Sequence, residues 1–272
     1  MDRAPLANPA SGIILGLFQQ IPLARVSRYL AQQGWDWIVL DMQHGCFDFQ
    51  TAHECIHSIR AAGAKPVVRV PIGGFGEIQK ALDLGALGIV VPMVNSRNEA
   101  ERAAQAAKYP PLGSRSIGGD VSYHYGSTYA ERANQDTLLL VQIEHVNAVR
   151  SVQQILSVRA VDGCFMGQVD LALSMGLSQT NFRENREHQS RIRQTVETCR
   201  SLGKLACYNA FSVPEAQERV RQGFQCITFR SDVDHFMQAT SGALADLHRQ
   251  LGGEERLQPS ESHRSALGKG QA

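Results

Sequence analysis

The 272-residue chain lacks the features that mark several large classes of protein. Its 27 Lys and Arg residues nearly balance 26 Asp and Glu residues, so we expect no general electrostatic attraction to nucleic acid or to an anionic membrane. No apolar run approaches the roughly 20 residues that cross a bilayer. The six cysteines form no Cys-x-x-Cys pair, and a chain of this length needs no disulfides. We therefore expect reduced thiols in a cytoplasmic protein.

What the chain does contain is a series of short apolar runs, each followed by helical periodicity. They are nearly continuous in Val, Ile, Leu and Phe, as is typical of strands buried on both faces. The eight runs are Ile13–Phe18, Trp37–Met42, Pro66–Val70, Gly88–Pro92, Leu138–Ile143, Gly163–Met166, Leu205–Tyr208 and Cys226–Phe229. Strict alternation of strands and helices implies parallel strands with right-handed crossovers.

Eight such units in about 250 residues predict an α/β protein with a single-domain (β/α)8 TIM barrel. A doubly wound open sheet is the alternative, but no G-x-G-x-x-G follows the first strand. We expect the barrel to occupy residues 1–251 and the tail, residues 252–272, to be disordered. One long excursion, Tyr109–Asp136, is expected to be a functional or disordered loop, and Asn147–Val158 is expected to be one helix.

In such a barrel the catalytic groups follow the carboxyl ends of the strands. Glu144 and Asp170 follow neighbouring strands and could hold Mg²⁺ or Mn²⁺, or could simply stabilise helix N-termini. His44 follows a buried strand beside Asp41 and is a candidate base, or a structural histidine. Arg69 lies in an apolar strand and needs an anionic partner, from the substrate or from a protein carboxylate.

Two further absences limit which mechanisms and substrates we expect. The five lysines lie at the amino ends of strands, on helices or in the tail, so no lysine is expected at the barrel mouth to form a Schiff base. The segments after the seventh and eighth strands, YNAFSVP and RSDVDHF, lack the glycines of a phosphate-binding loop. A phosphorylated substrate is therefore not expected.

The same segments resemble the HpcH/HpaI aldolase family of metal-dependent pyruvate aldolases, which includes macrophomate synthase. The resemblance covers roughly residues 12–240, and its motifs occur in the family's order. The segments that carry it are WDWIVLDMQHG, KPVVRVP, IQKALDLGALGIVVPMV, KYPPLGSRSIG, LLVQIEHVNAV and VDGCFMGQVDLALSMG. It implies a barrel of the phosphoenolpyruvate/pyruvate type.

The resemblance also implies roles for individual residues. Glu144 and Asp170 would bind a divalent metal, with Mg²⁺ favoured over Mn²⁺ or Co²⁺. His44, paired with Asp83, would be the acid–base group. Arg69 would stabilise the enolate oxygen.

Substrate binding and assembly follow from the same resemblance. Gln142 would line the pocket, and the turn of Gly167, Gln168 and Val169 would offer backbone N–H groups to the pyruvate carboxylate. No organic cofactor is implied. A C-terminal helix over residues 234–251 would pack on a neighbouring subunit of a homohexamer.

The leading hypothesis is a carbon–carbon lyase, a class II aldolase that cleaves or forms a 4-hydroxy-2-oxo acid through a metal-bound pyruvate enolate. Its partners would be a small 2-oxo acid, pyruvate or oxaloacetate, and an aldehyde or other acceptor. A second hypothesis is an oxaloacetate decarboxylase coupled to C–C bond formation, as in macrophomate synthase. A third is a non-catalytic barrel, supported only by Gln43 and Gln168, where the family usually has Glu and Pro.

Overall fold

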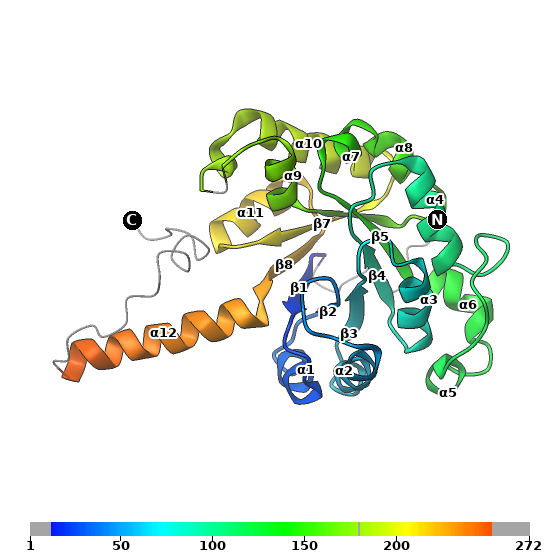
Figure 1. Ribbon diagram of the computed structural model, residues 1–272, viewed down its shortest axis with the longest axis horizontal. Coiled ribbons are helices and arrows are strands. Elements are labelled where there is room, and N and C mark those ends of the chain that lie inside the picture. Colours follow the sequence, from blue (N-terminus) through cyan, green and yellow to red (C-terminus); the bar gives the residue numbers. More distant parts are fainter. Residues whose placement is uncertain (1–11, 179, 252–272) are drawn as a thin grey trace.

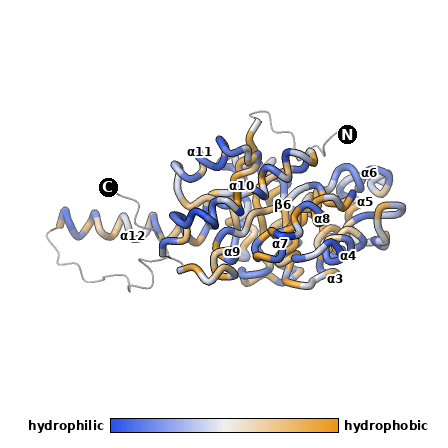
Figure 2. The backbone as a smooth tube through the Cα atoms, turned by 90° about the horizontal axis from the view of Figure 1, so that it is seen from above, coloured by the Kyte–Doolittle hydropathy of each residue, from blue (hydrophilic) through white to orange (hydrophobic). Residues whose placement is uncertain are grey.

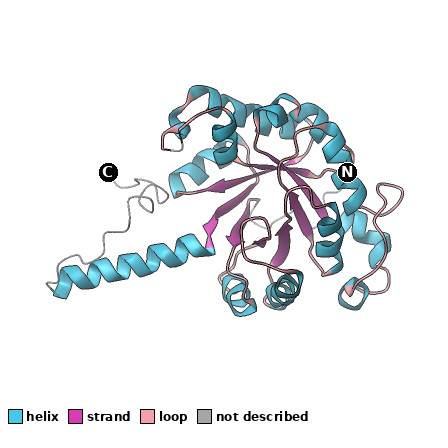
Figure 3. Ribbon diagram, in the orientation of Figure 1, coloured by secondary structure: helices cyan, strands magenta, loops and turns pink. Residues whose placement is uncertain are grey.

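The computed structural model describes residues 12–178 and 180–251. Within them, eight parallel strands close into one barrel in the order β1 to β8 (Figure 1), which confirms the predicted fold. The helices form an outer layer around the strands, as Figure 3 shows by colour. The strands are β1 (Ile14–Gln19), β2 (Trp37–Asp41), β3 (Lys65–Arg69), β4 (Gly88–Val91), β5 (Leu138–Ile143), β6 (Gly163–Met166), β7 (Leu205–Ala210) and β8 (Cys226–Ser231).

The apolar runs form strands because the barrel buries both of their faces. Every residue of β2, β4, β5 and β6 is buried. One side of each strand fills the barrel interior and the other packs against the helices. Parallel register brings the carboxyl ends to one rim, so that Asp41 of β2 lies beside Arg69 of β3, and Gln142 of β5 lies beside Phe165 of β6.

The outer layer follows the predicted alternation. The helices are α1 (Ala24–Ala31), α2 (Phe49–Ala61), α3 (Phe75–Asp83), α4 (Arg97–Ala107), α5 (Val121–Tyr125), α6 (Tyr129–Asp136), α7 (Val146–Arg150), α8 (Val152–Leu156), α9 (Gln168–Ser174), the 3-10 helix η2 (Phe182–Glu184), α10 (Arg186–Ser201), α11 (Val213–Gln222) and α12 (Asp232–Leu251). Gly34, Gly63 and Gly203 follow α1, α2 and α10 with φ of 94°, 94° and 65°, a conformation that favours glycine.

Two predictions about this layer were wrong. The segment Asn147–Val158 is not one helix but two, α7 and α8, with Ser151 between them. The excursion Tyr109–Asp136, expected to be a functional or disordered loop, contains the helices α5 and α6 and is therefore not disordered. These helices have a small core of their own, in which Tyr109, Val121, Tyr129 and Ala133 are buried. The sequence pattern missed it because the helices are short.

A buried lysine ties both ends of the excursion to the barrel. Lys108, which ends α4, donates from Nζ to the carbonyl oxygens of Asn134 at 3.1 Å and Thr137 at 2.7 Å. Its third partner is the carboxylate of Asp162 at 3.2 Å. Lys108 is only 1% exposed, and its partners Thr137 and Asp162 directly precede β5 and β6. Its charge is therefore neutralised at the amino ends of the strands, away from the barrel mouth.

The last helix, α12, leaves the barrel. It contacts the barrel through its first turn, where Asp232 accepts hydrogen bonds from the backbone N–H groups of Gln20 and Ile21, and then extends away from it (Figure 1). Hydrophobic and hydrophilic residues alternate along it in Figure 2. No helix in the described ranges is long and apolar enough to cross a membrane. The predicted disordered tail, residues 252–272, lies outside the described residues.

We predict that Lys108→Met lowers the free energy of unfolding by about 3 kcal/mol, because Asp162 and two carbonyl groups lose a buried partner. Urea denaturation followed by circular dichroism measures the difference. Lys80→Met, at an exposed position of α3, is the matched control and should change stability little. Equal stability of the two variants would contradict this role of Lys108.

Candidate active site

A cavity of about 250 Å³ opens at the rim where the carboxyl ends of the strands meet. Among the residues that the structure describes, no lysine lines it, as the positions of the lysines in the sequence predict. Six of the predicted site residues do line it: Arg69, Gln142, Gly167, Gln168, Val169 and Asp170. The convergence follows from the shared rim, because these residues come from β3, from β5, and from Gly167 and the first turn of α9 after β6.

Arg69 is held in place by a buried carboxylate. Its Nε and one terminal nitrogen donate to the two oxygens of Asp41 at 2.9 and 2.7 Å, and the guanidinium lies 4.8 Å from the centre of the Phe18 ring. Burial acts to raise the pKa of Asp41, but Arg69, Gln20 and the N–H of His44 outweigh it, and the net shift is downward. The structure therefore confirms the protein carboxylate that the sequence left open as a partner of Arg69.

Glu144 is a buried acid with both carboxylate oxygens hydrogen-bonded. One oxygen accepts from the backbone N–H of Met93 at 2.7 Å and the other from the side-chain amide of Gln142 at 2.6 Å. Burial raises the pKa of Glu144 to about 7, and the neighbouring Asp170 carboxylate shifts it in the same direction. Glu144 and Asp170 thus lie close together, in surroundings that disfavour the ionised form of Glu144.

Gly167 allows the strand β6 and its turn to approach Glu144. A Cβ atom at this position would lie 2.5 Å from Glu144 Oε2 and 3.0 Å from Gln142 Nε2. The side chain of Gln168 is turned aside, where it donates to the Asn209 carbonyl oxygen at 2.7 Å. The first N–H groups of α9, including those of Gln168 and Val169, have no partner within the helix and can bind an anion.

The structure does not bring His44 and Asp83 together within one chain. His44 is exposed on the loop after β2, with its backbone N–H bonded to Asp41. Asp83 ends α3, at the opposite end of that helix from the rim, and its carboxylate accepts from Arg115 at 2.8 Å. The predicted pairing of His44 with Asp83 therefore stays a prediction.

Sequence reasoning missed several residues of the cavity. Asp41 was noted only as a neighbour of His44, although an acid at the end of β2 opposite Arg69 is the signal for their pairing. Asn209 and Arg230, at the ends of β7 and β8, also line the cavity. Arg230 has a φ of 59° and donates to the Phe211 carbonyl oxygen at 2.8 Å. The sequence analysis considered the segments after β7 and β8 only as candidate phosphate-binding loops, which lack the required glycines.

The family model described as HpcH/HpaI aldolase/citrate lyase matches residues 15–239. The chain belongs to this family. It is 35% identical to the hydroxypyruvate/pyruvate aldolase of Rhizorhabdus wittichii, over 84% of this chain and 91% of that protein. It is 29% identical to the 2-keto-3-deoxy-L-rhamnonate aldolase of Salmonella gallinarum, over 85% of this chain and 87% of that protein.

Among solved structures, the crystal structure of the citrate synthase SbnG is similar, with a TM-score of 0.82 and 27% identity. The match covers 92% of this chain and 99% of that one. Membership in the HpcH/HpaI family confirms the resemblance noted in the sequence. It also confirms a carbon–carbon lyase, in place of the non-catalytic barrel.

The raised pKa of Glu144 predicts how stability depends on pH. In the metal-free protein the folded state holds a proton on Glu144 up to about pH 7, whereas the unfolded chain releases it near pH 4.3. The free energy of unfolding should therefore fall by about 4 kcal/mol as pH rises through this window. Glu144→Gln, which stays neutral, should lack this decrease when both proteins are denatured with urea across the pH range. Parallel curves for the two proteins would contradict the assignment.

Proposed function

We propose that the chain is a divalent-metal-dependent class II aldolase that cleaves or forms a 4-hydroxy-2-oxo acid through the enolate of pyruvate. The observation that carries the proposal is one cavity lined by Arg69 and Asp170. The buried acid Glu144 lies directly behind its wall, where it interacts with Asp170 and accepts a hydrogen bond from the cavity residue Gln142. The family and the aldolase names of the relatives support this chemistry.

The residues present fit a divalent metal. Carboxylate and carbonyl oxygens are the ligands that Mg²⁺ and Mn²⁺ prefer, and a dication beside Glu144 and Asp170 would relieve the effect that raises the Glu144 pKa. The Oε1 atom of Gln142 is buried with no hydrogen-bond partner beside this pair. We propose Mg²⁺ as the metal, with Mn²⁺ or Co²⁺ as alternatives. When bound, the metal supplies a Lewis acid that lowers the free energy of the enolate.

The other residues of the chain orient the substrate and handle charge. The N–H groups of Gln168 and Val169, after Gly167, would bind the carboxylate of the 2-oxo acid. Arg69 would place a fixed positive charge where negative charge develops on the enolate oxygen. Because Asp41 holds the guanidinium by two hydrogen bonds, little reorganisation is needed during the reaction.

We propose His44 as the group that accepts and returns the proton. Its exposed position on the loop after β2 lets it act through a water molecule. Within one chain Asp83 is bonded to Arg115 at the far end of α3, so the predicted pair with His44 would form only between two copies of the chain. This proposal requires an oligomeric enzyme.

The proposed homohexamer is supported by α12 beyond its first turn. Its apolar side chains fall at helical spacing on a helix that extends away from the barrel (Figure 1). The exposed members are Phe236 (60%), Met237 (41%), Leu244 (40%), Leu247 (53%) and Leu251 (80%). Burial of this apolar stripe against another copy would remove it from water. All six cysteines are free thiols, in keeping with the proposed cytoplasmic location.

A second candidate function is decarboxylation of oxaloacetate coupled to C–C bond formation. The guanidinium of Arg230 lines the same cavity as Arg69 and comes from β8, three strands away around the barrel. A second cation suits a substrate with a second carboxylate, either oxaloacetate or an acidic acceptor. Product analysis with oxaloacetate, with and without an added aldehyde, distinguishes this function from aldol cleavage.

Exchange of the pyruvate methyl protons in D₂O tests enolate formation without knowledge of the acceptor. With Mg²⁺ the exchange should be visible by NMR, and a chelator should abolish it. Glu144→Ala and Asp170→Ala should each slow it by roughly 100-fold or more. Glu131→Ala, an exposed acid on α6, is the control and should exchange normally. Normal exchange in either cavity variant would refute the proposed ligands.

The assembly is tested on α12. Phe236→Asp should dissociate the oligomer, because a charge would replace an apolar contact of the stripe. Gln238→Asp, at an exposed polar position of the same helix, is the matched control. Light scattering coupled to size exclusion gives the mass of each variant. A monomeric wild-type protein, or an unchanged mass in Phe236→Asp, would contradict the role of α12.

A further inference from the structure

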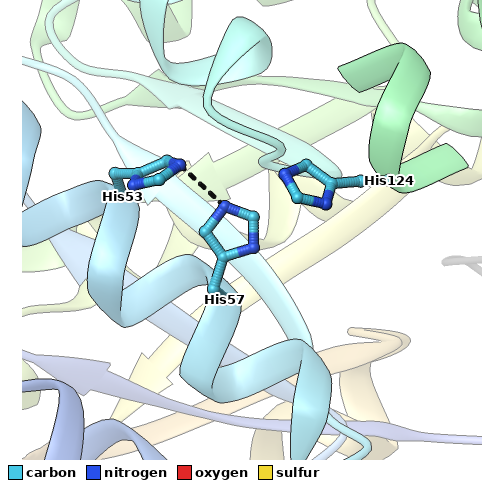
Figure 4. Close-up of side chains that lie close together, drawn as sticks. All are labelled: His53, His57 and His124. Carbon is cyan, nitrogen blue, oxygen red and sulfur yellow. Dashed lines mark hydrogen bonds between the residues drawn. The ribbon is translucent and has the colours of Figure 1, made fainter. Parts of the chain in front are cut away.

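Three histidine rings meet on the outer wall of the barrel, outside the catalytic cavity (Figure 4). His53 and His57 come from α2, and His124 comes from α5 in the excursion. One nitrogen of each ring lies within 4.8 Å of the others. The Nε2 atoms of His53 and His57 are 2.8 Å apart, and the ring centres of His57 and His124 are 4.2 Å apart.

The helix α2 supplies two of these rings on one face. Residues 53–57 read His-Glu-Cys-Ile-His, and histidines four positions apart on a helix lie one above the other. This is the spacing by which the His-Glu-x-x-His motif places two imidazoles on one zinc ion. The third ring is 67 residues further along the chain than His57, so no local pattern indicates it.

Contacts around the rings hold α5 against α2. Arg60, one turn beyond His57, donates to the carbonyl oxygen of His124 at 3.3 Å and lies 4.1 Å from the centre of the Tyr125 ring. The Tyr125 hydroxyl donates to the Gly85 carbonyl oxygen at 2.7 Å. The approach of His124 to the two other histidines is therefore set by several bonds besides the rings.

The donor set is that of a transition metal. Imidazole nitrogens suit Zn²⁺, which takes four ligands at ~2.0–2.1 Å in a tetrahedron and so holds neighbouring ligand atoms about 3.3 Å apart. The nitrogens of His53 and His57, now 2.8 Å apart, need to separate by about half an ångström. The His124 nitrogen, which lies within 4.8 Å of both, needs to come at most about 1.5 Å closer. A carboxylate is also at hand, because Asp120 Oδ2 lies 3.7 Å from His53 Nε2.

We propose that His53, His57 and His124 bind one Zn²⁺ or similar transition-metal ion, with Asp120 as the fourth ligand. The ion joins the excursion to α2 and has a structural role. In catalytic sites with the His-Glu-x-x-His motif the Glu acts as the general base beside the metal. Here that residue, Glu54, is exposed and accepts a hydrogen bond from Gln50 at 3.4 Å, which agrees with a structural role for the ion. With Asp120 as a ligand, the ion has no open position for a catalytic water.

The proposed ion is chemically distinct from the metal of the catalytic cavity. Three nitrogens select a transition metal, whereas the acids Glu144 and Asp170 offer oxygen atoms that suit Mg²⁺. The two sites share no residue. Zn²⁺ bound to the histidines should therefore persist in excess Mg²⁺ and in the Glu144→Ala variant.

The test measures metal content of the full-length protein. The protein is stripped with chelator, incubated with Zn²⁺ in excess Mg²⁺, desalted and analysed by elemental mass spectrometry. We expect about one Zn²⁺ per chain in the wild type and in Glu144→Ala, and at least a tenfold lower content in His57→Gln and His124→Gln. His248→Gln, a histidine on α12 far from the cluster in sequence, is the matched control and should retain the ion.

A second readout reports the geometry of the bound ion. Co²⁺ in place of Zn²⁺ should give the strong visible absorption of a tetrahedral site, and His57→Gln should abolish it. Zn²⁺ should also slow proteolysis within residues 109–136 in the wild type but not in His124→Gln. Equal zinc content in the wild type and the two cluster variants, or a weak octahedral Co²⁺ spectrum in the wild type, would overturn the proposal. Neither result depends on whether the aldolase activity is found.

Discussion

The buried ion pair of Asp41 and Arg69 organises the barrel mouth. The two residues are register partners at the ends of β2 and β3, and Asp41 is completely buried. Either charge alone would be strongly destabilising at this depth, because removal of one residue would leave the other as a buried charge without a counter-ion. The pair therefore fixes the Arg69 guanidinium at the rim, and the other polar groups of the cavity lie around this fixed positive charge.

The balance of charge around that arginine is uneven. The cavity and its immediate wall hold the carboxylates of Asp41, Glu144, Asp170 and Asp234 but only the guanidiniums of Arg69 and Arg230. The excess amounts to two negative charges when all these groups are ionised. Burial is the main cause of the raised pKa of Glu144, and the negative charge of the neighbouring Asp170 adds to it.

The parts of this architecture that depend on local pattern could be predicted from the sequence. Most strand residues are buried on both faces of the barrel wall, so the apolar runs located all eight strands. The shared rim then pointed to Arg69, Glu144 and Asp170 as candidate site residues. The excursion could not be predicted, because α5 and α6 are stabilised by contacts with distant segments, such as the bond from Tyr125 to Gly85.

Pairings between side chains that are distant in the sequence could not be predicted either, because they too depend on contacts between separate segments. Nothing local to Asp83 indicates that Arg115, 32 positions away, takes its carboxylate. The meeting of His124 with the two histidines of α2 is of the same kind. Resemblance to a family supplied roles for single residues, but it could not show which side chain a residue contacts within one chain.

The closure of the barrel also has a consequence for biosynthesis. The strand β1 needs β8 as its neighbour, and the hydrogen bond from Gln20 to Asp232 spans 212 positions. During translation the edge of β1 that pairs with β8 therefore stays unpaired until nearly the whole chain has been made. Contacts of such long range form slowly because a large loop must close first. The chain is thus most exposed to aggregation late in synthesis, when seven strands are present and the eighth is still missing.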